Sequence, residues 1–296
     1  MPEPTLAPPP SQAFPYGVVY ADPQSAWQET DRPAIRERLE ALRALHVNVV
    51  VQTFDSRLVD SGEEARWLIY LDEAERAGIG VIARLWPPND WNGTSFDLTY
   101  VGRFLQVVGD HPALVAYVGL HEPQEDFTSE QLRAFYRGLK EIAPQVPIFH
   151  FNNDLSRFER SLRYPGRDFS DDICDICAVF YYPFRIENGQ TVFERQELLA
   201  VVSANAELVH ARDPDAQFWF LGQAFADADN PHAFRAPAPE EMLELARMVL
   251  DVPGVDGFLW YPYQHGAYDL VLSDPEMASQ RQAVREAYER YVERAP

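Results

Sequence analysis

The sequence predicts an α/β fold, a single (β/α)8 TIM barrel in which eight parallel strands alternate with helices. Eight short segments rich in β-branched and aromatic residues recur along the 296 residues, and most are bounded by Pro, Gly, Asp or Asn. Amphipathic helical patterns lie between them. The length suits a barrel. A doubly wound sheet is the competing fold, but no Gly-rich phosphate loop follows the first strand.

The strand candidates are residues 16–20, 47–54, 79–85, 114–121, 146–151, 173–182, 218–225 and 255–263. Helices are predicted where apolar residues recur at helical spacing, as at Ile35, Leu39 and Leu42. Thr128 followed by Gln131 has the spacing of a capping box. The last helix is expected over 275–292, and the pattern for a helix over 155–163 is weak.

The N-terminal residues 1–15 are rich in proline, and we expect a disordered spacer followed by a catalytic-type barrel domain over 16–296. The segment lacks the apolar core of a signal peptide but looks like a spacer that follows a removed export signal. We therefore expect an extracellular or periplasmic protein, and a lipid anchor on the removed segment is compatible with this. The genomic reading frame upstream of Met1 tests the expectation.

The formal net charge of −21 argues against nucleic acid or an anionic membrane as a partner, because phosphate binding needs clustered Lys and Arg. No apolar run approaches the ~20 residues of a membrane span. We expect a monomer and no cofactor. Cys174 and Cys177 have C-x-x-C spacing but lie in a predicted strand, so we expect them to be buried core residues rather than a redox or metal motif.

The most informative residue is Glu122, which ends the apolar run of residues 113–120 together with His121. A buried parallel strand is expected to be apolar along its length. A carboxylate at its end is costly to desolvate unless it faces a cleft. In a parallel barrel the C-terminal strand ends form the face where active sites lie. We therefore expect Glu122 to be a catalytic acid/base, with a structural ion pair as the alternative.

The other predicted strands also end in aromatic and polar residues, a combination that suits sugars because aromatic rings stack on C–H faces and polar groups bind hydroxyls. We expect substrate contacts from His121, Trp260, Tyr182, Asn152, His150, Arg84, Trp86, Tyr20 and Tyr263. For Trp260 the alternative is core packing, and only one of Tyr181 and Tyr182 can point into the barrel mouth. No metal site is expected, because His121, His150 and His265 lack the spacing of metal ligands.

Several of these phrases resemble barrel-fold glycoside hydrolases of the clan that contains cellulases, mannanases and β-galactosidases. They are His121-Glu122-Pro123, Asp110-His111-Pro112-Ala113-Leu114, Tyr181-Tyr182-Pro183 and the strand-eight Trp260. The resemblance covers residues 16–292 as pattern more than identity. It implies that Glu122 is the general acid/base, and that His121 stands where the clan has an asparagine.

The clan's nucleophile is a second glutamate at the end of the seventh strand, where this chain has Gln223. An amide cannot form the covalent glycosyl intermediate of a retaining mechanism. Three explanations stay open: Gln223 was engineered from Glu, another carboxylate serves, or the protein binds sugar without cleaving it. The candidates for the other carboxylate are Asp55, Asp154, Glu187, Asp227 and Asp229. Bacterial glycosidase-like proteins that this chain resembles carry such a glutamine, which favours the second and third explanations.

We therefore predict a hydrolase that acts on a poly- or oligosaccharide, with Glu122, Gln223 and Asp55 as its catalytic residues. A carbohydrate-binding barrel without activity is the alternative, and a metal-dependent barrel hydrolase is a third possibility.

Overall fold

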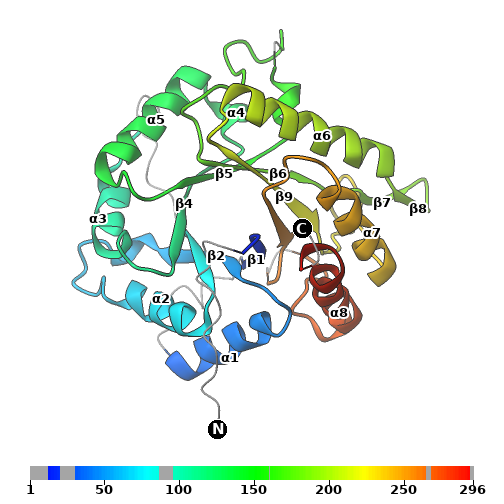
Figure 1. The fold of residues 1–296 in the computed structure, drawn as a ribbon, viewed down its shortest axis with the longest axis horizontal. Coiled ribbons are helices and arrows are strands. Elements are labelled where there is room, and N and C mark those ends of the chain that lie inside the picture. Colours follow the sequence, from blue (N-terminus) through cyan, green and yellow to red (C-terminus); the bar gives the residue numbers. More distant parts are fainter. Residues whose placement is uncertain (1–12, 21–30, 87–95, 160, 265–267, 294–296) are drawn as a thin grey trace.

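The computed structural model describes residues 13–20, 31–86, 96–159, 161–264 and 268–293. Within them eight parallel strands close into a barrel in the order β1-β10-β9-β6-β5-β4-β3-β2. The strands form the centre and the helices surround them (Figure 1). The predicted (β/α)8 fold is therefore confirmed. The predicted spacer falls largely on residues 1–12, which lie outside the described residues.

The barrel strands have bounds close to the predicted ones. They are β1 (Tyr16–Tyr20), β2 (Val49–Asp55), β3 (Gly80–Trp86), β4 (Leu114–His121), β5 (Ile148–Asn152), β6 (Ile176–Tyr181), β9 (Gln217–Gln223) and β10 (Gly257–Tyr261). Each is parallel to its neighbours, so the C-terminal ends of all eight meet at one mouth.

The helices follow the strands along the chain and pack outside them. They are α1 (Arg32–Arg43), α2 (Arg66–Ala77), α3 (Thr99–Val108), α4 (Pro123–Asp126), α5 (Ser129–Ile142), α6 (Arg195–Arg212), α7 (Pro239–Leu250) and α8 (Ala278–Ala287). The predicted capping box is present at the start of α5, where Gln131 N donates to Thr128 Oγ1 and Thr128 N donates to Gln131 Oε1. The predicted last helix begins as a 3₁₀ turn, Pro275–Met277, and ends as a π turn, Tyr288–Val292.

Two of the three buried clusters divide the barrel core according to the alternation of side chains along each strand, and the third, Phe225, Phe234 and Val271, lies outside the strands. The inner cluster fills the barrel with residues such as Val51, Phe149, Trp219 and Leu259. The outer cluster packs the other face of the strands against the helices. Because neighbouring strand residues belong to different clusters, strand register decides which side chains reach the mouth.

An antiparallel hairpin, β7 (Phe184–Glu187) and β8 (Gln190–Phe193), lies between β6 and α6 and was not predicted. Its turn is Asn188-Gly189, and both residues have positive φ, 51° and 77°. Asn-Gly is a strong signal for a two-residue hairpin turn of this kind. The predicted helix over 155–163 reduces to a 3₁₀ turn, Leu155–Arg157.

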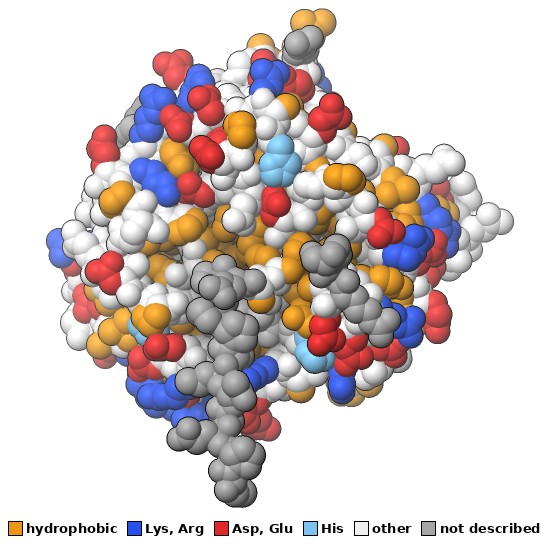
Figure 2. Space-filling model, viewed as in Figure 1, with side chains coloured by type: hydrophobic (Ala, Val, Ile, Leu, Met, Phe, Trp, Pro, Cys, Tyr) orange, Lys and Arg blue, Asp and Glu red, His pale blue; other side chains and the backbone are white. Residues whose placement is uncertain are grey.

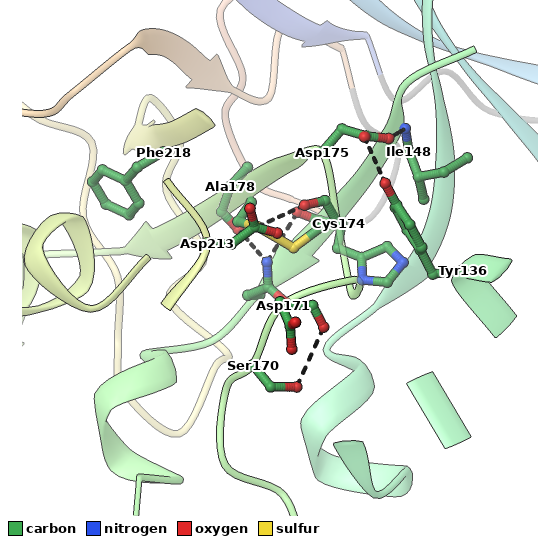
Figure 3. Close-up of a disulfide and its surroundings, with 12 residues drawn as sticks. Tyr136, Ile148, Ser170, Asp171, Cys174, Asp175, Ala178, Asp213 and Phe218 are labelled. Atoms are coloured by element: carbon green, nitrogen blue, oxygen red, sulfur yellow. Dashed lines mark hydrogen bonds between the residues drawn. A yellow bond between two sulfur atoms is a disulfide. The ribbon is translucent and has the colours of Figure 1, made fainter. Parts of the chain in front are cut away.

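Cys174 and Cys177 form a disulfide with a Cα–Cα distance of 5.6 Å, which corrects the expectation of two unpaired core cysteines. In a continuous strand, residues three apart are separated by about 10 Å, too far for a disulfide. Here β6 begins only at Ile176, after a bend that includes Asp172 with a φ of 56°. Figure 3 shows Asp175 beside the disulfide, where its carboxylate accepts hydrogen bonds from Tyr136 Oη at 2.8 Å and Ile148 N at 2.6 Å.

No helix among the described residues is long and apolar enough to cross a membrane.

Gly17 provides a test of the barrel closure. A Cβ at this position would lie 2.0 Å from Val49 O on the neighbouring strand. We expect Gly17→Ala to lower the free energy of unfolding by at least about 2 kcal/mol, because backbone must shift to relieve the overlap. In α3, a Cβ at Gly102 would meet only side-chain atoms at 3.5 Å and beyond. Gly102→Ala should therefore be neutral or stabilising by about 0.5–1 kcal/mol in the same denaturant titration. Equal stability of both variants would contradict this packing.

Candidate functional site

A cleft of about 1010 Å³ opens at the C-terminal end of the strands, between the ends of β4, β5 and β6, the β7–β8 hairpin, the start of α6 and the loop 226–235. Its aromatic lining is Phe180, Tyr181, Tyr182, Phe193 and Phe234, and its acidic lining is Glu122, Asp154, Glu194 and Glu197. Viewed along the barrel, hydrophobic side chains gather near the centre of the molecule and charged ones lie mostly around the rim (Figure 2). A cleft of this size and lining suits a ligand larger than one sugar ring.

The backbone at the end of β4 turns Glu122 into this cleft. The pairing of β4 with β5 shifts in register between Val118 and His121, and Glu122 follows with φ 51° and ψ 43°. A non-glycine residue in the left-handed region is uncommon and carries strain. Pro123 disfavours the right-handed helical conformation at Glu122 and begins α4. Strained backbone of this kind is a recurrent feature of functional sites.

The carboxyl group of Glu122 lies in an environment that favours its protonated form. Its side chain is 34% exposed, and Asn153 Nδ2 donates to Glu122 Oε1 at 3.0 Å. Burial raises its pKa above the usual value, and the negative charges of Glu125 and Asp126 raise it further. A carboxyl group with a raised pKa in a cleft is suited to donate a proton.

An aromatic stack forms one wall beside Glu122. The Tyr182 ring stacks on Phe180 at 5.3 Å and on Tyr261 at 5.8 Å between centroids. Burial raises the pKa of Tyr182 and Tyr261, so their hydroxyls stay neutral. Tyr261 Oη lies 3.2 Å from Tyr268 Oη. The wall therefore offers ring edges and hydroxyls, which suit the C–H faces and hydroxyls of a sugar.

A second polar cluster lies farther along the cleft. Tyr181 Oη donates to Glu194 Oε2 at 2.7 Å, and Arg185 Nε lies 3.1 Å from the same oxygen. Burial and the Glu194 carboxylate raise the pKa of Tyr181. Both tyrosines of the predicted pair line the cleft, although they point to different sides: Tyr182, the residue after β6, packs in the mouth, and Tyr181, the last residue of β6, packs toward the hairpin and α6.

His121 lies on β4 beside Glu122, and Arg84 and Trp86 lie on the neighbouring strand β3; none of the three lines the cleft. His121 Nε2 is 3.9 Å from Glu122 Oε2, and its side chain is 42% exposed at the mouth. Desolvation and the charge of Arg84 lower the pKa of His121 to about 4, so the ring is neutral near pH 7. Arg84 stacks over Trp86 at 4.8 Å. These three stay candidates for substrate contacts.

Gln223 is fully buried at the end of β9, and its amide is bonded to backbone. Gln223 Oε1 accepts from Phe184 N at 3.0 Å. Its Nε2 lies 3.0–3.3 Å from the carbonyl oxygens of Phe184, Phe225 and Arg235. The side chain thus joins the hairpin and the loop 226–235 to the barrel. This differs from the expected catalytic role, because neither amide atom is presented to the cleft.

Asp55 and Trp260 also have structural positions. The Asp55 carboxylate is buried, caps the turn Ser56–Leu58 and bonds to Arg57 at 2.8 Å. The Trp260 ring is 0% exposed in the outer cluster, and its Nε1 donates to Tyr16 Oη at 2.8 Å. A ring without an exposed face cannot stack on a sugar. Alternation along β10 places Tyr261 in the mouth instead.

Three more residues that we expected to contact the substrate instead pack within the protein. His150 and Asn152 are fully buried, because they lie on the outward face of β5, whereas Phe149 and Phe151 face inward. Burial lowers the pKa of His150 to about 3, and Asn152 Nδ2 donates to His150 O at 3.2 Å. Tyr263 packs against the outer cluster. Tyr20 ends β1, but its side chain lies outside the described residues.

Among the other carboxylates considered from the sequence, only Asp154 lines the cleft. Asp154 Oδ1 accepts hydrogen bonds from Ser156 and from Asn205 Nδ2, so this carboxylate caps a turn and anchors α6. No group of three His, Cys, Asp or Glu side chains in the described parts of the chain is arranged to hold a metal ion. His265 lies outside those parts.

The sequence reasoning missed Glu194, His232 and Phe234, which line the cleft. Arg185 also lines it, and Asn153 at the end of β5 holds Glu122. Arg185 belongs to the β7–β8 hairpin, which Asn188-Gly189 could have revealed. His232 and Phe234 come from the loop 226–235, which carries no signal in the sequence that places it over the barrel mouth.

The fold is shared with glycoside hydrolases of known structure. A GH5_18 protein from Bifidobacterium longum subsp. infantis matches with a TM-score of 0.70 at 15% identity, over 95% of this chain and 80% of that one. A GH5_18 variant from Streptomyces cattleya, in complex with Manβ1-4GlcNAc, matches with a TM-score of 0.69 at 18% identity, over 96% and 82%.

An exo-β-1,4-mannosidase from Opitutaceae bacterium strain TAV5 matches with a TM-score of 0.62 at 17% identity, over 95% of this chain and 60% of that one. No protein-family model matches this chain, and no curated protein matches it. At these identities the likeness establishes the shared barrel fold, and the resemblance noted in the sequence is confirmed at that level.

Gln223→Glu tests the structural role of the buried amide. A carboxylate there would face the three carbonyl oxygens without hydrogens to donate. We expect the free energy of unfolding to fall by about 2–4 kcal/mol at pH 8, with no activity created. Gln196→Glu is the control, because Gln196 lines the cleft but is exposed. A stable, newly active Gln223→Glu variant would instead restore the nucleophile position of the resembled clan.

Proposed function

We propose that this protein is a glycoside hydrolase in which Glu122 acts as the general acid. The observation that carries the proposal is the position of Glu122: a strained strand end turns a carboxyl group with a raised pKa into an aromatic-lined cleft. The barrel shared with glycoside hydrolases supports the reaction class without fixing it.

In the proposed reaction, Glu122 gives its proton to the glycosidic oxygen as the bond from that oxygen to the anomeric carbon breaks. The resulting carboxylate keeps the hydrogen bond from Asn153 Nδ2 and can accept a proton from a water molecule that attacks the sugar. The neutral hydroxyls of Tyr182 and Tyr261 are suited to hold the sugar, since neither is ionised near pH 7.

For the substrate, we propose a neutral oligosaccharide that extends along the cleft from Glu122 toward the Tyr181–Glu194 pair. The volume of about 1010 Å³ and the length of the lining support a substrate of more than one residue. β-Mannosides such as Manβ1-4GlcNAc are the first compounds to test, because a protein of the same fold was solved with this disaccharide.

A carbohydrate-binding barrel without hydrolysis is the second candidate. It is favoured by Gln223, whose buried amide leaves no carboxylate at the end of β9. A binding measurement combined with a product assay distinguishes the two functions. The second candidate predicts sugar binding by calorimetry with no product after prolonged incubation, whereas the first predicts product.

Glu122→Gln tests the catalytic assignment. The amide keeps the shape of the side chain but has no acid proton to transfer, so we expect kcat to fall by about 10²–10⁴-fold while calorimetry shows unchanged sugar binding. Glu207→Gln is the matched control, because Glu207 is exposed on α6 and outside the cleft. Unchanged turnover of the Glu122 variant would remove Glu122 from the mechanism.

The same variant should change stability in a pH-dependent way. A carboxyl group whose pKa is raised in the folded protein favours folding below its unfolded pKa, and this contribution is lost as pH rises through the folded pKa. Glu122→Gln stays neutral. It should therefore match the wild type near pH 4 and be more stable than the wild type near pH 8, measured by urea unfolding. A variant less stable than wild type at pH 8 would contradict the raised pKa.

A further inference from the structure

Glu125 and Glu122 both accept a hydrogen bond from the side-chain amide of Asn153. Asn153 Nδ2 lies 3.0 Å from Glu122 Oε1 and 2.7 Å from Glu125 Oε1, so those two oxygens can be at most 5.7 Å apart. Glu125 is exposed and is not part of the cleft lining, so its position points to an action on Glu122 rather than on the substrate.

The short helix α4 fixes this convergence. Glu122 is its N-cap residue and Glu125 lies three residues later, so the two side chains project from the same side of one turn. Glu125 N donates to Glu122 O at 3.0 Å. From the neighbouring loop, Arg167 Nη1 donates to Gln124 O at 2.9 Å and also contacts Glu125 O. Asn153, which directly follows β5, meets the helix from the barrel side.

We propose that Glu125 is a positioning residue for Glu122: through the shared amide of Asn153 and its own negative charge, it holds the Glu122 carboxyl group in place and in its acid form. This inference rests on the proposed function of Glu122 as the general acid.

Other groups face Glu122 from the elements packed around it, and most of them are neutral near pH 7. The lowered pKa of His121 keeps its ring neutral. Burial raises the pKa of the hydroxyls of Tyr182, Tyr261 and Tyr268, so these hydroxyls stay protonated. The groups are His121 of β4, Tyr182 after β6, Tyr261 of β10, Tyr268 and, within α4, Glu125 and Asp126, and the charge of Arg84 of β3 acts on His121 and Tyr261. Glu125 and Asp126 raise the pKa of Glu122, and of these two only Glu125 is hydrogen-bonded to Asn153 among the described residues.

The experiment is a ¹³C-carboxyl NMR titration of Glu122 in the full-length protein, with the resonance assigned by its loss in Glu122→Gln. Removing the charge of Glu125 removes a repulsion that opposes ionisation of Glu122. We therefore expect Glu125→Gln to lower the pKa of Glu122 by roughly 0.3–0.7 units, while Glu207→Gln leaves it unchanged. An unchanged Glu122 titration in Glu125→Gln would overturn the proposal, whether or not the protein hydrolyses sugars.

Kinetics give the second measurement on a hydrolysed substrate. In Glu125→Gln the alkaline limb of the kcat/KM profile should move to lower pH by the same amount, while kcat below that limb stays within about threefold of wild type. Asn153→Ala should reduce or remove the effect of the Glu125 change, because Asn153 joins the two carboxylates. Loss of turnover at every pH with sugar binding retained would make Glu125 itself a catalytic residue and overturn the positioning role.

Discussion

Closure of eight parallel strands is the constraint on which the site depends. It brings the C-terminal ends of β4, β5 and β6 together at one mouth, although these segments are far apart in the sequence. It also requires one face of each strand to fill the barrel and the other to pack on the helices. A side chain can reach the mouth only from the last inward position of a strand or from the loop that follows it. Glu122 and Tyr182 meet this condition, whereas Trp260 and His150 do not.

The end of β4 concentrates the unusual features of the chain. A register shift, a left-handed backbone at Glu122 and the following proline all lie within residues 118–123. The left-handed backbone has an energetic cost, and a partly buried carboxyl group beside two like charges adds to it. Proteins keep such costs where a function needs the geometry. The short helix α4 contributes in a second way, because it brings Glu125 back onto Asn153 and Glu122.

The end of β9 contrasts with it. Gln223 has the place of the second carboxylate in the resembled clan, but its amide bonds to the backbone of the hairpin and of the loop 226–235. An amide suits this role because it both donates and accepts, whereas a buried carboxylate there would face carbonyl oxygens. At the barrel mouth, the end of β4 therefore holds an ionisable group, whereas the end of β9 binds the hairpin and the loop 226–235 through hydrogen bonds.

The sequence by itself determined the barrel, because eight segments rich in β-branched and aromatic residues predict strands and the amphipathic patterns between them predict helices. It also singled out Glu122, since an ionisable pair interrupts an apolar run. It did not determine which of two adjacent residues faces inward. The expected contacts Trp260 and Asn152 are fully buried, whereas the neighbouring Tyr261 packs in the mouth and Asn153 binds Glu122. A one-residue difference in register reverses the face, and only the paired strands fix it. The disulfide, the partners of Gln223 and the meeting of Glu125 with Asn153 were likewise decided by the tertiary structure, because each depends on chain turns or on contacts between distant segments.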